Sequence, residues 1–149
     1  MDELRKRLNG EFCVYCGMRA ATIDHYPPKS LTNHGLLLPC CSECNGIAGT
    51  TYPFDFEKRA NFVKEKIKSK NKKYLDMPVW SADDLAELSG NLKRSVKICQ
   101  EKRRITNKRL AWDVYSYLLS LAKDKHFVKT FAECGIIITS EKLLTSNTN

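Results

Sequence analysis

Two pairs of cysteines, each with two residues between its members, constrain the fold of this chain more than any other feature. The pairs are Cys13 with Cys16 and Cys41 with Cys44, and 24 residues separate the two pairs. A CxxC turn places two thiolates on one side of a tight loop, and zinc binds four such ligands as a tetrahedron. The intervening segment is long enough for a hairpin that returns the second pair to the first. The pattern therefore predicts a structural zinc site.

Cys40 is an alternative ligand for the second pair. Cys40 and Cys44 have three residues between them, whereas Cys41 and Cys44 repeat the spacing of the first pair, which favours Cys41. Cys40 then takes an apolar position at a strand end, and Cys99 and Cys134 are expected in the core. Seven cysteines, an odd number, argue against a fully paired disulfide framework, and in a reducing cytosol CxxC pairs more often bind metal or do redox work.

The character of the sequence changes near residue 53. Residues 1–52 are rich in Cys, Gly, Pro and short apolar runs, and they predict a strand at 21–25, a returning strand at 35–38 and a short helix at 41–48. Residues 53–149 form the second part, which is basic and consists mostly of helix formers. The expected fold class is therefore α+β, with a small zinc-stapled core followed by a mainly α-helical extension packed on it.

Three stripes of apolar residues recur with helical spacing in the extension, at positions 56–67, 85–99 and 110–121. The first stripe predicts a helix over residues 54–74. Ser81, with Asp84 three residues later, predicts a capped helix start that leads into the second stripe. For the basic segment 103–109, which precedes the third stripe, helix and turn both stay open.

The formal net charge of +8 is unevenly distributed. Residues 53–76 carry eight basic and four acidic side chains, residues 93–109 carry eight basic and one acidic, and residues 1–52 are neutral. Basic blocks of this kind fit a polyanion, through attraction to phosphates and release of counterions. A lysine-rich helix face also keeps a protein soluble, so both interpretations stay open.

No apolar run approaches the ~20 residues that a membrane helix needs. The charged start of the chain also lacks the apolar stretch of a signal peptide. We therefore expect a cytoplasmic protein with no membrane partner.

Three polar residues occupy informative positions beside the cysteine pairs. Asp24 and His25 lie between the pairs, and Asn45 directly follows the last cysteine. An imidazole titrates near neutral pH and suits a general base, whereas carboxylate and amide oxygens suit a magnesium ion. Each residue also has an ordinary explanation. An Asp-His pair usually lies on the protein surface without a function, and an asparagine side chain often forms a hydrogen bond with nearby backbone. Their position between and beside the zinc ligands makes them candidate active-site residues.

The order CxxC, DH-x-P and CxxCN resembles the HNH endonucleases, whose shared core is the ββα-metal finger. The resemblance covers roughly residues 11–50 and rests on seven spaced residues. It implies that His25 is the general base, that Asp24 and Asn45 hold one catalytic Mg²⁺ or Mn²⁺ ion, and that the zinc is structural. The sequence departs from the family at Leu36, where an asparagine often fixes the loop near the base, and this departure concerns how His25 is oriented.

The resemblance also implies a function, namely metal-dependent hydrolysis of phosphodiester bonds in DNA, most readily double-stranded DNA. Small phage and bacterial HNH proteins carry comparable helical extensions, which places the protein in a bacterial or phage-infected cell. A homodimer is left open, because the apolar stripes could equally form an intramolecular core. The main alternative is a non-catalytic zinc module that binds nucleic acid, in which Asp24, His25 and Asn45 are incidental. A thiol oxidoreductase is a third alternative, but it has no use for Asn45.

Overall fold

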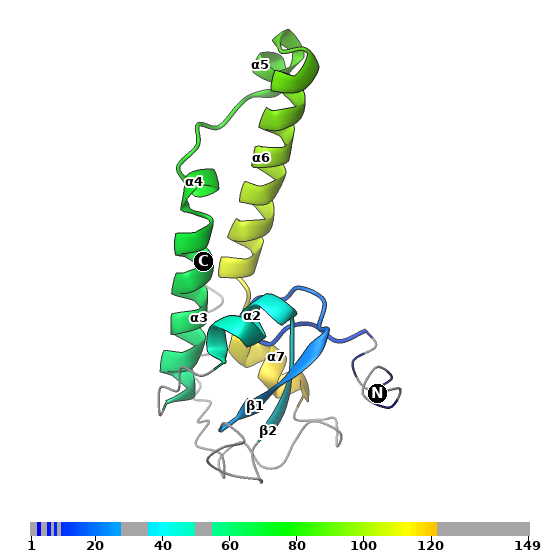
Figure 1. Cartoon of the computed structure of the whole chain (residues 1–149), viewed down its shortest axis with the longest axis vertical. Coiled ribbons are helices and arrows are strands. Elements are labelled where there is room, and N and C mark those ends of the chain that lie inside the picture. The colour runs from blue at the N-terminus through cyan, green and yellow to red at the C-terminus, as the bar shows by residue number, and fades with distance from the viewer. Residues whose placement is uncertain are drawn as a thin grey trace.

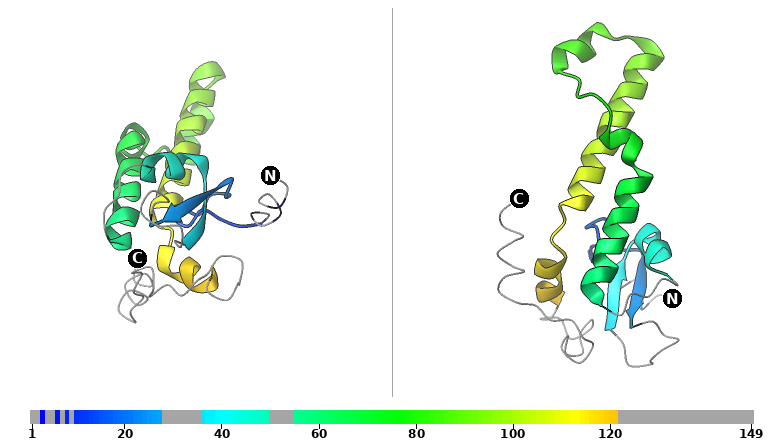
Figure 2. Two further views of the ribbon diagram at one scale, coloured as in Figure 1. Left: turned by 60° about the horizontal axis from the view of Figure 1, so that its bottom comes forward. Right: turned by 90° about the vertical axis from the view of Figure 1, so that its left-hand side faces the viewer.

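The computed structural model describes residues 10–27, 36–49 and 55–121, together with residues 3, 6 and 8. These residues form a two-stranded sheet with helices beside it and a long helical arm that extends away from it (Figures 1 and 2). The elements are β1 (Thr22–Tyr26), β2 (Leu36–Cys40), α2 (Ser42–Ala48), α3 (Phe56–Lys70), α4 (Lys72–Leu75), α5 (Ala82–Glu87), α6 (Gly90–Leu110) and α7 (Val114–Leu121). The predicted combination of α and β structure is confirmed.

The sheet is an antiparallel hairpin of β1 and β2, in the order that the sequence predicts. Its register pairs Thr22 with Cys40 and Tyr26 with Leu36. Successive side chains of a strand point to opposite faces. In β1 this alternation buries Asp24 and Tyr26 and leaves His25 exposed. The hairpin thus separates two neighbouring candidate residues into two environments.

The arm is formed by α3 and α4, which run away from the sheet, and by α6, which returns beside them (Figures 1 and 2). The first apolar stripe lies on the buried face of α3, as predicted. The helix expected over residues 54–74 is, however, divided at Asn71, where α3 ends and α4 begins. The side-chain amide of Asn71 donates to the carbonyl of Ile67 at 2.8 Å. Asparagine competes with helical backbone hydrogen bonds in this way, which accounts for the interruption.

The second stripe does not form one helix. Ser81 and Asp84 do make the predicted capping box, with both hydrogen bonds at 3.1 Å. The helix that they start ends at Glu87, and α6 begins at Gly90, whose φ of +60° suits glycine. The basic segment 103–109, which the sequence left open, is helical and belongs to α6.

Burial along the arm is concentrated near the sheet. In α5 no residue is buried, and in the first half of α6 only Val96 is buried, while Leu92 is 61% exposed. Cys99 is half-buried rather than a core residue, and Cys134 lies outside the described residues. The apolar residues at 85–99 are therefore not buried as a group, although their periodicity suggested a helix face packed against another element. None of the described helices combines the length and apolar character that crossing a membrane requires.

The buried core joins the cysteine-rich part of the chain to the helical part. Around the hairpin, side chains from residues 13–16, β1, β2 and α2 pack in one cluster with side chains from α3 and α7. Tyr26 meets Phe56 edge-on, with ring centroids 5.2 Å apart. The helical extension thus packs on the cysteine-rich part, while a division into domains at residues 52 and 53 stays a prediction.

Candidate metal centre and polar site

Four cysteine side chains converge beside the hairpin. One Sγ atom from each of Cys13, Cys16, Cys41 and Cys44 lies within 4.8 Å of all the others. Zinc–thiolate bonds of about 2.3 Å place the sulfurs of a tetrahedral site about 3.8 Å apart. The Sγ atoms of Cys16 and Cys41 are 3.7 Å apart, which fits this geometry. The four ligands that the sequence predicts are thus brought together, and they could bind a structural metal ion such as zinc.

Backbone hydrogen bonds fix the first CxxC turn against the sheet and shape the second. In the first turn, the amide of Val14 donates to the carbonyl of Pro39 on β2 at 2.9 Å. The amide of Gly17 donates to the carbonyl of Cys13 at the same distance. In the second, Cys41 is the N-cap of α2, and its Sγ accepts from the amide of Cys44 at 3.4 Å. The two turns are therefore held at the sheet and at the start of α2.

Cys40 lies beside the cluster but is not one of the four converging thiols. It is fully buried at the end of β2, and its Sγ is 3.9 Å from the Sγ of Cys13. The two neighbours differ because β2 ends at Cys40, whereas Cys41 is already the N-cap of α2. The group of converging sulfur atoms thus includes that of Cys41 and not that of Cys40.

Hydrogen bonding within the cluster shifts the pKa values of two of its cysteines in opposite directions. Hydrogen bonds with Cys13, Cys16 and Cys44 lower the pKa of Cys41. Hydrogen bonding with Cys13, Cys16 and Cys41, together with burial, raises the pKa of Cys44 far above its ordinary value. Zinc binds thiolates, so the cysteines that are still protonated lose their protons when a metal ion binds.

Trp112, in the segment between α6 and α7, packs against the first CxxC turn. Its indole N–H donates to the carbonyl of Val14 at 3.2 Å. Gly17 lies so close that a Cβ on it would be 2.3 Å from Cε3 of the indole ring, and its φ is +75°. Glycine is required here both for its backbone angle and for the space above it.

We expect Gly17→Ala to destabilise the metal-loaded protein more than Gly10→Ala. Gly10 has a similar φ of +81°, but a Cβ there would meet nothing within 4 Å. The positive φ costs each variant about 1 kcal/mol, and overlap with Trp112 adds about 1–3 kcal/mol for Gly17→Ala. Urea unfolding measures the difference. Equal losses in the two variants would show that the indole ring moves aside freely.

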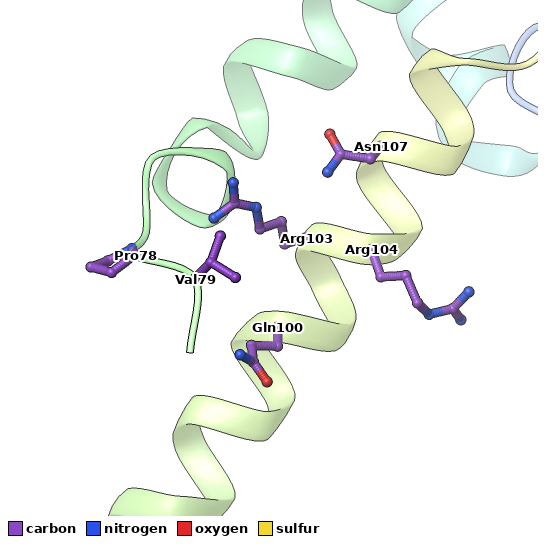
Figure 3. Close-up of a pocket in the computed structure, with 6 residues that line it drawn as sticks. All are labelled: Pro78, Val79, Gln100, Arg103, Arg104 and Asn107. Carbon is purple, nitrogen blue, oxygen red and sulfur yellow. The ribbon is translucent and has the colours of Figure 1, made fainter. Parts of the chain in front are cut away.

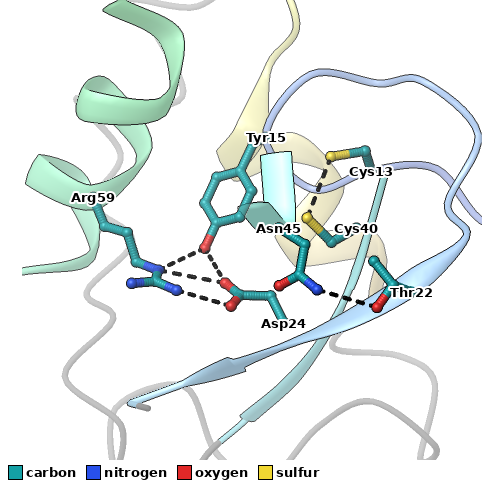
Figure 4. A network of polar contacts seen from close by, with 7 residues as sticks. All are labelled: Cys13, Tyr15, Thr22, Asp24, Cys40, Asn45 and Arg59. Carbon is teal, nitrogen blue, oxygen red and sulfur yellow. Dashed lines mark hydrogen bonds and ion pairs between the residues drawn. The ribbon is translucent and has the colours of Figure 1, made fainter. Parts of the chain in front are cut away.

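Asp24 lies in a buried polar network rather than at an open site (Figure 4). Arg59 of α3 donates to its Oδ1 at 2.8 Å and to its Oδ2 at 3.4 Å. The hydroxyl of Tyr15 donates to Oδ2 at 2.5 Å. Asp24 is 4% exposed and Arg59 only 1%. Burial, and next the charge of Asp24, raise the pKa of Tyr15 well above its usual range, so this hydroxyl stays a donor.

The structure brings Asn45 to the face of β1 that carries Asp24, and leaves His25 on the opposite face. The amide nitrogen of Asn45 donates to the hydroxyl of Thr22 at 3.2 Å, and its amide oxygen is turned toward Asp24 in Figure 4. Thr22 and Asp24 share a face because they are two residues apart in the strand. His25 is exposed to solvent. The two candidate metal ligands therefore lie on one side of β1, while the candidate base lies on the other.

A divalent ion does not fit on Asp24 while Arg59 holds the carboxylate. Both carboxylate oxygens already accept hydrogen bonds, and the guanidinium supplies the positive charge that an ion would otherwise provide. The remaining oxygen donor, on Asn45, is neutral. Among the described residues, the four cysteines are the one group of His, Cys, Asp or Glu side chains with the proximity of a metal site.

Arg59 and Arg109 are two buried residues of the site that the sequence interpretation missed. A signal for Arg59 exists, because it lies three residues after Phe56 and four before Val63, on the apolar stripe of α3. It is also the one arginine in a helix whose other cations are lysines, and arginine suits a buried ion pair better. Arg109 has no comparable signal in the sequence.

Two hollows lie on the helices outside the buried network. One, of about 200 Å³, lies between residues 78–79 and α6, with Arg103 and Arg104 in its lining (Figure 3). The other, of about 560 Å³, lies between α2 and α3 and is lined in part by Lys66 and Lys70. Basic side chains thus line part of each hollow, arginines in the first and lysines in the second.

A scan against protein-family models finds no matching family, and searches of curated proteins and of solved structures find no significant match.

Proposed function

We propose that the chain is a metal-dependent endonuclease of the HNH type that hydrolyses phosphodiester bonds in DNA. The observation that carries the proposal is the ββα arrangement of β1, β2 and α2, stapled by four cysteines, with Asp24, His25 and Asn45 on its strand and helix. These are the residue types of the family in the family's order. The exposed position of His25 gives a general base access to water and to a large substrate.

In this proposal His25 takes a proton from the water that attacks phosphorus. Asp24 and Asn45 would hold the Mg²⁺ or Mn²⁺ ion, which when bound supplies charge stabilisation at the phosphate. The ion requires Arg59 to release the carboxylate of Asp24, because the structure pairs the two. The four-cysteine cluster holds the hairpin and α2 together and has no part in the chemistry.

The positive charge of the helical arm favours a polyanionic partner, and we propose that this partner is DNA. Exposed lysines follow α3 into α4, and further lysines and arginines follow α6 along about 31 Å of helix. Lys66 and Lys70 line the hollow beside α2, the helix that carries Asn45. Contacts of this kind position a duplex through its phosphates without reading its bases.

A homodimer stays a prediction.

A second candidate, a non-catalytic zinc module that binds nucleic acid, is favoured by the Asp24 network. A buried arginine and a buried tyrosine satisfy Asp24 completely, which gives this residue a structural role without any catalytic ion. The separation of His25 from Asp24 across β1 points the same way. The two candidates share the zinc site and the basic arm and differ only in whether phosphodiester bonds are broken.

Cleavage of supercoiled plasmid distinguishes the two candidates. With Mg²⁺ or Mn²⁺ present we expect nicking or linearisation, and we expect His25→Ala to reduce its rate about 10²–10⁴-fold, the usual contribution of a general base. Met18→Ala, at another exposed position near the cysteines, is the control. The metal requirement is tested by leaving the ion out, with the zinc content verified, because a chelator would also attack the cysteine cluster.

Two outcomes would contradict the proposal in different ways. If the wild-type protein retards the plasmid in a gel but never cuts it with either ion, the non-catalytic module is the correct function. If cutting survives His25→Ala at the wild-type rate, His25 is not the base.

A further inference from the structure

The end of α6 contacts the second half of the cysteine cluster through Arg109. One terminal nitrogen of its guanidinium donates to the Sγ of Cys44 at 3.8 Å, and the other lies 2.9 Å from a carboxylate oxygen of Glu43. Arg109 is 8% exposed, although it lies in the most basic segment of the chain. Its side chain is therefore fixed over a metal-binding thiol and not directed into solvent.

The residues that follow Arg109 contact the first half of the cluster. Trp112 donates to the carbonyl of Val14, between Cys13 and Cys16, and covers Gly17. Lys64 of α3 donates to the carbonyls of Leu110 and Trp112, at 3.2 and 2.5 Å, and so holds this segment in place. Within four residues, the return of the arm thus touches both CxxC turns.

Charge gives these contacts a consequence for metal binding. A zinc ion with four thiolates carries a net charge of −2, and a buried negative charge is unfavourable unless cations or hydrogen-bond donors compensate it. The cysteine-rich segment supplies little compensation, because Arg19, the one basic residue among residues 10–27, is exposed. The buried cation that touches a ligand sulfur comes instead from α6, 65 residues further along the chain than Cys44.

We propose that Arg109 is an outer-sphere residue of the metal centre, and that the docking of the arm and the retention of zinc are thermodynamically coupled. Groups that donate hydrogen bonds to metal ligands typically change metal affinity about 10–100-fold. Because coupling between two equilibria is reciprocal, loss of the metal also loosens the end of α6 from the sheet. The proposal is independent of whether the chain cuts DNA.

Zinc transfer from the full-length protein to an excess of a chromogenic chelator tests the first half of the proposal. We expect Arg109→Gln to release zinc about 10–100-fold faster than the wild type. Lys108→Gln removes the same charge from the neighbouring, exposed position on α6 and is expected to match the wild type. Arg109→Lys retains the charge but lacks the two terminal nitrogens of a guanidinium. Its rate of zinc release is expected to lie between those of Arg109→Gln and Lys108→Gln. Equal release rates for Arg109→Gln and Lys108→Gln, with both variants folded, would overturn the proposal.

If Arg109→Gln fails to fold with zinc, the rate of zinc release is measured on Glu43→Gln instead. Glu43 is 40% exposed, so its substitution leaves the core intact while removing the ion pair that orients Arg109. Faster zinc release is again expected, by a few-fold, and an unchanged rate would overturn the proposal.

Fluorescence of Trp112 tests whether Arg109 also holds the arm against the metal centre. In a Trp80→Phe background Trp112 is the one remaining tryptophan, since the chain has two. At saturating zinc, the coupling predicts that Arg109→Gln shifts its emission toward the red and that Lys108→Gln does not. An identical spectrum for these two variants would overturn the proposal, because it would show that the contact of Arg109 with the metal centre does not hold the arm in place.

Discussion

Cys41→Ala is expected to abolish tight zinc binding and to unfold the hairpin, whereas Cys40→Ala is expected to retain one zinc ion per chain. The Sγ of Cys41 belongs to the group of four sulfurs within 4.8 Å of one another, and that of Cys40 does not. Structural zinc binding contributes about 10–16 kcal/mol in zinc-finger peptides, which is comparable with the whole stability of a domain, about 5–15 kcal/mol. Zinc content per chain, with circular dichroism, measures both effects.

The pair of variants is closely matched, since the two cysteines are neighbours and each substitution removes one sulfur. Cys40 is fully buried, so Cys40→Ala lowers the stability slightly through lost packing but not the zinc content. Removal of zinc from the wild type with a chelator should reproduce the circular dichroism spectrum of Cys41→Ala. A Cys40→Ala protein without zinc, beside a Cys41→Ala protein with zinc, would show that the ligand set was assigned wrongly.

The zinc ligands and the hairpin could be predicted because they depend on short-range rules. The CxxC spacing fixes which thiols can share an ion, and the alternation along a strand places Asp24 and His25 on opposite faces. The start of α5 was equally predictable, since the capping box of Ser81 and Asp84 lies within four residues. Each of these features is decided by residues that are neighbours in the sequence or share one motif.

The partner of Asp24 could not be predicted in the same way. Arg59 lies 35 residues away, and although its place on the apolar stripe of α3 indicates burial, nothing in the sequence indicates which carboxylate it meets. Periodicity likewise shows that Leu92 belongs to an apolar stripe, but not whether another element covers it, and here it is exposed. Both the ion-pair partner of a charged residue and the burial of an apolar stripe depend on tertiary packing. The partner of Asp24 decides whether this residue is interpreted as a metal ligand or as half of a buried ion pair.

Arg59→Met is expected to lower the free energy of unfolding by about 3–5 kcal/mol, as for other buried ion pairs that lose one partner. Methionine fills a similar volume, so the loss arises from leaving the carboxylate of Asp24 buried with Tyr15 as its remaining side-chain donor among the described residues. The double variant Asp24→Asn, Arg59→Met removes the charge as well and should recover much of the loss. Urea unfolding of the zinc-loaded proteins measures these differences. A single variant as stable as the wild type would show that Asp24 does not depend on Arg59.

The same variants decide whether a divalent ion can use Asp24, independently of any cleavage assay. A ligand that binds only the folded state raises its stability by RT ln(1 + [L]/Kd), so Mg²⁺ should stabilise a protein whose Asp24 is available. Because Arg59 and the ion compete for one carboxylate, Mg²⁺ is expected to raise the Tm of Arg59→Met more than that of the wild type or the double variant. Equal shifts in the wild type and Arg59→Met would mean that Arg59 does not exclude the ion. No shift in any of the three would remove Asp24 from the catalytic proposal, and the buried ion pair would then be its whole role.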